Sequence, residues 1–192
     1  MPIGDILPFF LAWIRNPRRI AAVTPSGVRV ALLMTQEINA QAGPVIELGP
    51  GTGSLTYSIL NRGVPEKNLT LVEISAGFVK LLKKRFPRAR VLRMDATRIG
   101  AQRLFENATV GSVVSGLGLR GMPPNQVAAI LGGAFKYLRS DGTFYQITYG
   151  PRCPVPEWVL EQLGLHAALI GWTIWNLPPA SVYRISRLPS HS

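Results

Sequence analysis

Apolar residues along the chain form two kinds of run. Short stretches rich in apolar and β-branched residues predict buried strands at 45–48, 69–75, 89–97, 110–119 and 142–150. Between them, apolar residues recur every three or four positions, which predicts helices with one apolar side. Two more strands are expected between 166 and 187, where a turn at 176–179 would join them into a hairpin.

Glycine, proline and serine residues mark the expected helix ends. Gly63 and Pro65 close the first helix, and Ser75 is placed to cap the second, which Pro87 stops. Two prolines suit the first turn of a third helix that runs to about Leu138. A short helix is expected over 157–163.

Strands that alternate with helices predict an α/β fold with a mostly parallel, seven-stranded sheet that ends in an antiparallel hairpin. A chain of 192 residues favours one domain, expected over 23–188, with an N-terminal segment 1–22 and a tail 189–192. In such sheets, ligands bind beyond the carboxyl ends of the strands.

The amino-acid composition limits which partners the chain can bind and which chemistry it can perform. Hydrophobic residues make up 47% of the chain and charged residues 16%, which excludes a disordered chain. The net charge of +11 indicates an anionic partner, either nucleic acid or an acidic membrane. One cysteine and two histidines allow neither an internal disulfide nor a zinc cluster, so we expect a reducing cytoplasm and metal-free chemistry.

The first 20 residues do not predict export or a membrane span. No stretch of the chain approaches the roughly 18–20 uninterrupted apolar residues that a spanning helix needs. The positive charges follow the apolar stretch, and Asp5 stands where a signal peptide carries basic residues. We therefore expect a cytoplasmic protein.

The segment VIELGPGTGSLT (45–56) predicts a strand, a glycine turn and a helix. Its three glycines allow a sharp turn and a close approach of the backbone to a ligand. A phosphate-binding P-loop is excluded because no Gly-Lys-Ser/Thr follows. A dinucleotide fingerprint fails at its last glycine, where Ser54 or Thr56 stands.

Three acidic residues, Glu47, Glu73 and Asp95, are expected at one edge of the sheet, at or near the ends of successive strands. A carboxylate there accepts hydrogen bonds from an ammonium, a ribose diol or an adenine amine, and it attracts a sulfonium cation. The alternative is a loop that merely turns the chain.

This combination resembles the class I methyltransferases, which have a Rossmann-like fold and use S-adenosylmethionine without a metal. The resemblance implies that Glu47 and the glycine loop hold the methionine end, Glu73 the ribose, and Asp95 with Ala96 the adenine. The implied cofactor-binding residues are Glu47, Gly49, Gly51, Thr52, Gly53, Glu73, Ile74, Asp95, Ala96 and Ser115.

The stretch after the fourth strand, SGLGLRGMPP (115–124), indicates which acceptor is methylated. Methylases of base amines carry Asn/Asp-Pro-Pro-aromatic or Asn-Leu-Pro-Tyr there, and this stretch has no Asn, Asp or aromatic residue to clamp a base. NLPP does occur at 176–179, where it is most simply the hairpin turn.

Five segments together resemble the bacterial phospholipid N-methyltransferases: FLAWIRNPRRIAAVTPSG, VIELGPGTGSLT, VVSGLGLRGMP, QITYGPRCPVP and NLPPASVYRISR. The resemblance implies methylation of phosphatidylethanolamine towards phosphatidylcholine at the inner face of the cell membrane. One departure is Gly118, where the family motif S-G-L-P-L leads us to expect proline. The implied acceptor-binding residues are Leu117, Leu119, Tyr183 and Arg184, and Tyr149 or the substrate's own phosphate is the candidate base.

The N-terminal segment carries the pattern of a helix that lies in a membrane interface. Apolar residues from Ile6 to Ile14 share one helical side, and arginines follow directly. The alternative is a helix that packs on the domain as a lid over the cofactor. The expected membrane-binding residues are Phe9, Phe10, Trp13, Ile14, Arg15, Arg18 and Arg19.

Two other functions compete with phospholipid methylation. An rRNA adenine dimethyltransferase shares ELGPGTGSLT and would use the positive charge on RNA, but this chain lacks the base clamp. A non-catalytic membrane-surface module would keep the fold without needing the three acids. We therefore expect an anionic membrane and phosphatidylethanolamine as partners, and no nucleic acid.

Overall fold

The protein is described from a computed structural model over residues 25–105, 109–174 and 179–189. The strands are β1 Val45–Leu48, β2 Leu69–Glu73, β3 Arg90–Arg93, β4 Val110–Ser115, β5 Leu138–Tyr149, β6 Leu165–Thr173 and β7 Ala180–Arg187. The α-helices are α3 Pro25–Met34, α4 Ser54–Asn61, α5 Ala76–Arg85, α6 Pro124–Phe135 and α7 Glu157–Gln162. Short 3-10 turns are η2 Ala40–Ala42, η3 Glu66–Asn68, η4 Ala96–Ala101 and η5 Leu119–Gly121.

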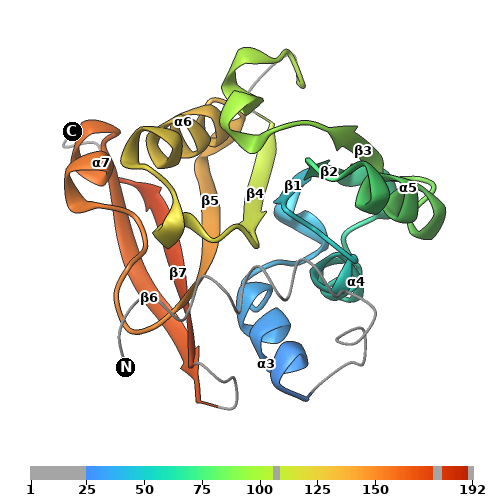
Figure 1. Ribbon diagram of the computed structural model, residues 1–192, viewed down its shortest axis with the longest axis horizontal. Helices are drawn as coiled ribbons and strands as arrows, with labels where there is room; N and C mark the ends of the chain where they lie inside the picture. The colour runs from blue at the N-terminus through green and yellow to red at the C-terminus, as the bar shows by residue number, and fades with distance from the viewer. Residues whose placement is uncertain (1–24, 106–108, 175–178, 190–192) are drawn as a thin grey trace.

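The strands form one seven-stranded sheet in the order β3-β2-β1-β4-β5-β7-β6. The first five strands pair in parallel, while β7 pairs antiparallel with both β5 and β6. This confirms the predicted α/β fold with its C-terminal antiparallel hairpin (Figure 1). The order reverses direction between β1 and β4, which is where ligands bind in sheets of this kind.

Two apolar cores cover the two faces of the sheet. One core packs α6 and α7 against side chains such as Phe144 and Ile185. The other packs α3, α4 and α5 against side chains such as Tyr145 and Val182. Because successive side chains of a strand point to opposite faces, neighbours in β5 and β7 belong to different cores.

Several boundaries differ from the predicted ones. The pattern did not predict α3, and β5 begins at Leu138 instead of 142, directly after α6 ends at Phe135. Pairing with β4 explains the earlier start, because Leu138 lies in register with Val110. Among the described helices, none combines the length and the apolar composition needed to cross a bilayer.

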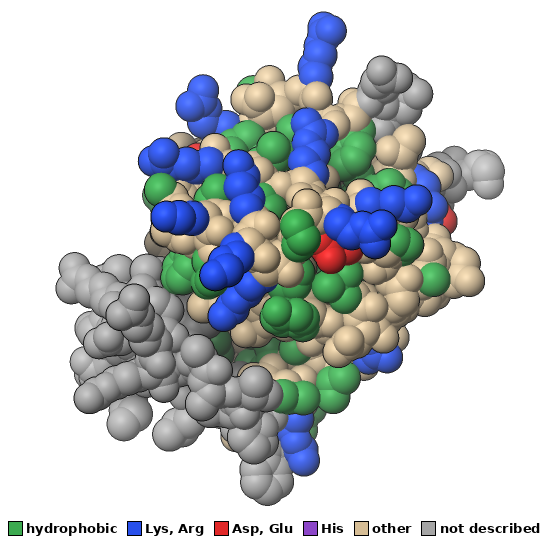
Figure 2. Space-filling view, turned by 90° about the vertical axis from the view of Figure 1, so that its right-hand side faces the viewer, with side chains coloured by type: hydrophobic (Ala, Val, Ile, Leu, Met, Phe, Trp, Pro, Cys, Tyr) green, Lys and Arg blue, Asp and Glu red, His purple; other side chains and the backbone are tan. Residues whose placement is uncertain are grey.

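Basic residues are concentrated on the part of the molecule that carries α5 and β3. Figure 2 shows this side, on which many Lys and Arg side chains lie at the surface. Eight of them fall between positions 80 and 98, where Asp95 is the acidic residue. They are exposed, and they are Lys80, Lys83, Lys84, Arg85, Arg88, Arg90, Arg93 and Arg98.

Candidate cofactor and acceptor site

The loop between β1 and α4 carries three glycines with positive φ, at +70° for Gly49, +55° for Gly51 and +88° for Gly53. A Cβ atom on Gly49 would lie 2.6 Å from the Leu117 side chain, and one on Gly53 would lie 2.5 Å from Phe86. A Cβ atom on Gly51 would meet no atom within 4 Å. Packing therefore requires the two outer glycines, while the middle one borders open space in which a ligand can approach the backbone.

Glu47 is a buried carboxyl group beneath this loop, with 1% of its surface exposed. Its Oε2 accepts a hydrogen bond of 2.7 Å from the Thr56 hydroxyl, while its Oε1 has no partner among the described residues. Burial raises the pKa of Glu47 to about 8, the Thr56 hydrogen bond opposes that rise, and the nearby charge of Glu73 adds to it. Burial disfavours the ionised form, so a cation placed beside this carboxyl group would stabilise the carboxylate and lower its pKa again.

Glu73 ties the end of β2 to the glycine loop. Its Oε2 accepts a hydrogen bond of 3.1 Å from the Gly51 amide, and its Oε1 accepts one of 2.8 Å from the Ser75 amide. Ser75 does stand at the N-cap position of α5, but its hydroxyl makes no capping hydrogen bond, which corrects that prediction. Ile74 follows Glu73 and exposes 65% of its surface at this edge.

The third acidic residue, Asp95, lies just beyond β3. Its Oδ1 accepts hydrogen bonds from the Thr97 amide at 2.9 Å and from the Thr97 hydroxyl at 2.8 Å, so it caps η4. Ala96 is buried in the core beside it. Because β1, β2 and β3 are adjacent and parallel, Glu47, Glu73 and Asp95 come from neighbouring strands at one edge of the sheet.

The loop after β4 is held from two sides. The Ser115 hydroxyl, which is fully buried, accepts a hydrogen bond of 3.4 Å from the Leu117 amide. Leu119 is also fully buried and packs in the core. Ser115 and Leu119 thus support the loop from beneath, whereas Leu117 lies against Gly49 beside the glycine loop.

Gln146 on β5 holds the same loop, and it was not among the predicted site residues. Its amide nitrogen donates to the Leu117 carbonyl at 2.8 Å and to the Ile147 carbonyl at 2.6 Å. Because both partners are carbonyls, they fix which end of the amide is nitrogen. Its Oε1 is buried and has no partner within the described part of the chain. The available signal in the sequence was a polar residue inside the apolar run TFYQIT.

Tyr149 closes β5 at the same edge of the sheet. Its carbonyl accepts a hydrogen bond of 3.2 Å from Arg120. Burial raises the pKa of the Tyr149 phenol above its ordinary value of 10. The phenol therefore stays protonated at neutral pH and is suited to donate a hydrogen bond; the role of general base is chemically unfavourable for it.

Tyr183 and Arg184, predicted together as acceptor-binding residues, point to opposite faces of the sheet. The Tyr183 hydroxyl donates to the Pro151 carbonyl at 2.6 Å, beside the segment that follows β5. Arg184 forms an ion pair of 3.1 Å with Glu37, which follows α3. The structure therefore places Tyr183 on the face that carries Gln146, its partner in the pairing of β5 with β7, and gives the Arg184 charge a carboxylate partner on the other face.

The remaining predicted residues fall in two groups. Thr52 lies in the glycine loop, where its carbonyl accepts a hydrogen bond from Arg85. Seven positions lie outside the described residues: Phe9, Phe10, Trp13, Ile14, Arg15, Arg18 and Arg19.

These contacts fit a ligand of the kind that the resemblance implies. The unpartnered Glu47 Oε1 can accept a hydrogen bond from an ammonium, and the space over Gly51 admits a chain that lies close to the backbone. The exposed Ile74 offers an apolar surface to a planar ring. In the described part of the chain, no group of three or more His, Cys, Asp or Glu side chains is placed to hold a metal ion.

Comparison with known proteins agrees with this geometry. Residues 45–142 match a family described as "Methyltransferase domain". The ornithine lipid N-methyltransferase of Singulisphaera acidiphila is 29% identical over 189 residues, which cover 93% of this chain and 94% of that protein.

Two further similarities concern parts of the chain or the fold alone. Ribosomal RNA small subunit methyltransferase A of a Synechococcus species is 37% identical over 90 residues, which cover 45% of this chain and 29% of that enzyme. A crystal structure of a SAM-dependent methyltransferase from Archaeoglobus fulgidus superposes with a TM-score of 0.67 at 12% identity, and covers 94% of this chain and 99% of that one.

Proposed function

The chain belongs to the methyltransferase-domain family and is an S-adenosylmethionine-dependent methyltransferase, and from this premise we propose that its acceptor is the amine of a membrane lipid, with phosphatidylethanolamine as the substrate. The S-adenosylmethionine supplies an electrophilic methyl group when it is bound. The residues of this chain then have three tasks: to hold that group, to admit an uncharged amine in line with the methyl group, and to exclude water.

The proposal that the acceptor is a lipid amine rests on the loop after β4. Between Gly116 and Gly121 it consists of Leu117, Gly118, the buried Leu119 and Arg120. This set offers neither a side-chain amide nor an aromatic ring, which are the groups that hold a flat base by hydrogen bonds and stacking. An aliphatic amine needs no such clamp, and the apolar loop suits the desolvation that its lone pair requires.

Coverage of the relatives supports the same choice. The relative named as a lipid N-methyltransferase aligns along 93% of this chain, whereas the rRNA methyltransferase aligns along 45%. The name of the lipid relative also makes an ornithine lipid the competing substrate, since it carries an amine on a different headgroup.

We assign roles to the site residues as parts of this proposal. Glu47 pairs with the ammonium of the cofactor, and the backbone at Gly51 lies along it. Asp95 and Ile74 hold the adenine end. On the acceptor side, Leu117 forms the apolar wall and Tyr149 donates a hydrogen bond that orients the substrate. The amine loses its proton before it attacks, because an ammonium has no lone pair, and the lipid phosphate is the proposed proton acceptor.

The positive surface supports an anionic membrane as the partner. The net charge is +11, and the basic face over α5 and β3 contributes eight exposed cations (Figure 2). Each Lys or Arg near an anionic bilayer contributes about 1 kcal/mol of attraction, a contribution that salt weakens. We further propose that residues 1–22 lie in the interface at the cytoplasmic side, as their amphipathic pattern predicts.

Transfer of labelled methyl groups tests the acceptor directly. The full chain is incubated with labelled S-adenosylmethionine and, in separate reactions, with vesicles of phosphatidylethanolamine, vesicles of ornithine lipid, or 16S rRNA. We expect label in phosphatidylethanolamine. If only ornithine lipid is labelled, the acceptor is still a lipid amine but phosphatidylethanolamine is the wrong headgroup. If rRNA is labelled and no lipid is, the proposal is refuted.

A further inference from the structure

Exposed apolar side chains gather on two packed elements, the end of β6 and the helix α3. Trp172 exposes 63% of its surface, Ile174 64%, Leu32 50% and Val28 41%. Single exposed apolar residues are ordinary on a protein surface, but these are four of the nine large ones found on the described residues. We call these four side chains the apolar rim.

The apolar rim lies at the edge of the sheet that carries the site. Thr173 on β6 pairs with Ala180 on β7, and Ala180 pairs with Tyr149 at the end of β5. The end of β6 is therefore level with the carboxyl end of β5, three residues beyond the level at which β1 and β4 end. In Figure 1 the same strand ends at the lower side of the view, near α3.

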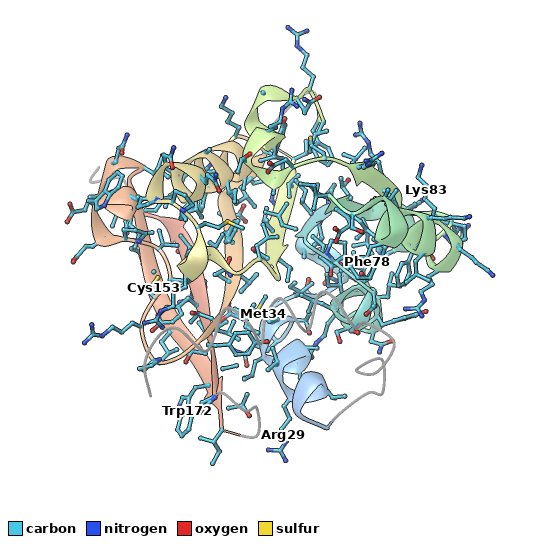
Figure 3. All side chains as sticks on the ribbon, in the orientation of Figure 1. Arg29, Met34, Phe78, Lys83, Cys153 and Trp172 are labelled. Carbon is cyan, nitrogen blue, oxygen red and sulfur yellow. The ribbon has the colours of Figure 1, made fainter. Side chains whose placement is uncertain are left out.

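Contacts with the backbone of β6 hold α3 beside that strand, while Trp172, which pairs with Ser181, projects from the other face of the sheet, so the rim surrounds the end of β6 from both sides. The side chain of Gln36, just after α3, donates to the Ile170 carbonyl at 3.2 Å. The Leu33 side chain packs on Gly171, where a Cβ atom would lie only 2.7 Å away. Figure 3 shows that Trp172 and Arg29 lie at this same end of the molecule.

Exposed arginines lie on or shortly after the elements that reach this edge of the sheet. Arg29 stands between Val28 and Leu32 on α3, Arg120 follows β4, and Arg152 follows β5, and all three are exposed. A tryptophan with aliphatic neighbours and arginines is the composition that proteins place at a membrane–water interface, where the apolar parts enter the acyl region and the guanidinium groups meet phosphates.

We propose that the apolar rim is a bilayer-docking surface, which inserts Trp172 and Ile174 into the interface of an anionic membrane. The inference rests on the proposed lipid substrate and deepens it. A bilayer at this edge faces the loop after β4, so that a lipid amine reaches the site while its acyl chains stay in the membrane. The rim is made of described residues in the folded domain and acts beside the proposed interfacial segment 1–22.

Flotation of the full chain with vesicles tests the rim. The vesicles are phosphatidylcholine with about one third phosphatidylglycerol, so that both apolar and charge attraction contribute. Trp172→Glu with Ile174→Glu lowers the partition coefficient by about tenfold or more, since each side chain loses its burial in the membrane. Trp172→Ser with Ile174→Ser does the same on vesicles of phosphatidylcholine alone, which separates lost apolar contact from added charge.

A matched control comes from the opposite edge of the sheet. Trp158 and Leu188 expose 52% and 53% of their surfaces, and Leu188 follows the far end of β7. Trp158→Glu with Leu188→Glu introduces the same two charges in place of a tryptophan and an aliphatic residue. We expect its partition coefficient to stay within about twofold of the unchanged chain, because these positions lie away from the docking edge.

Three further measurements on the rim variants complete the test: their unfolding temperature, their elution volume in size-exclusion chromatography and their catalytic activity. Methylation of a short-chain, monomeric phosphatidylethanolamine should be unchanged in the rim variants, because that substrate needs no bilayer. If the rim variants bind vesicles as well as the Trp158→Glu, Leu188→Glu control does, the proposed docking surface is refuted. A lowered unfolding temperature with unchanged flotation would mean that residues 1–24 cover the rim, and a lost dimer would mean that a second copy covers it; both overturn the proposal. Absence of methyl transfer to every lipid refutes the proposed function alone.

Discussion

Replacing Glu47 with glutamine should separate the charge of this side chain from its shape. Its pKa of about 8 means that about one tenth of the molecules carry an ionised Glu47 at pH 7. If the carboxylate pairs with the cofactor ammonium, binding must first ionise it. Affinity for S-adenosylmethionine should then rise about tenfold from pH 6 to pH 7, which is about 1.4 kcal/mol, and level off near pH 8.

The free protein should show the opposite dependence on pH in its stability. The pKa of Glu47 is about 8 in the folded protein and 4.5 in the unfolded chain. The contribution of neutral Glu47 to folding stability is therefore fully present below pH 4.5 and is lost as pH rises through 8. At about 1.4 kcal/mol for each pKa unit, the full loss amounts to about 5 kcal/mol. The glutamine variant cannot ionise, so it should become the more stable protein at the upper end of this range.

Titration calorimetry in two buffers of different ionisation enthalpy measures both affinity and proton release. At pH 7 the unchanged chain should release close to one proton for each cofactor bound, and the glutamine variant should release none at this position. The titration of the cofactor itself is common to both proteins and cancels in the comparison. An affinity that is flat between pH 6 and pH 7, or an equal pH dependence in both proteins, would refute the reasoning.

Four further substitutions test other parts of the site. Gly51→Ala should reduce cofactor affinity, and it should cost only about 1 kcal/mol of folding stability, because alanine is strained at this positive φ. Gly53→Ala should cost about 1–3 kcal/mol more, because its Cβ atom would lie 2.5 Å from Phe86. Calorimetry measures the affinity of each variant, and thermal unfolding measures its stability. Tyr149→Phe should slow turnover by less than about tenfold and leave its pH profile unchanged, and a loss of about 100-fold with a shifted profile would make the phenol the base. Gln146→Leu should raise KM for the lipid and lower kcat by freeing the Leu117 loop, with cofactor affinity kept; unaltered kinetics would contradict its positioning role.

Local pattern was sufficient for the sheet and for the placement of the glycine loop and the three acidic residues at one edge of it. The strands had runs of apolar residues, and the glycine loop brought its own turn chemistry, so both could be read along the chain. Glu47, Glu73 and Asp95 each stand at or near a strand end, and parallel pairing puts such ends at one edge wherever the strands are neighbours. These features depend on a few adjacent residues and on a general rule of sheet geometry.

The acceptor side depended on contacts between distant segments, which no local pattern encodes. Gln146 reaches Leu117, which is 29 positions earlier in the chain, and the ion pair between Arg184 and Glu37 spans 147 positions. Alternation along β7 sends Tyr183 and Arg184 to opposite faces, and only the pairing of β5 with β7 decides that Tyr183 shares the face of Gln146. Burial decided the rest: the protonation of Glu47 follows from its removal from water, and the apolar rim exists because α3 and the end of β6 pack together with four side chains left outside. Sequence order determines which groups are available, and tertiary packing determines which of them meet and what charge they carry.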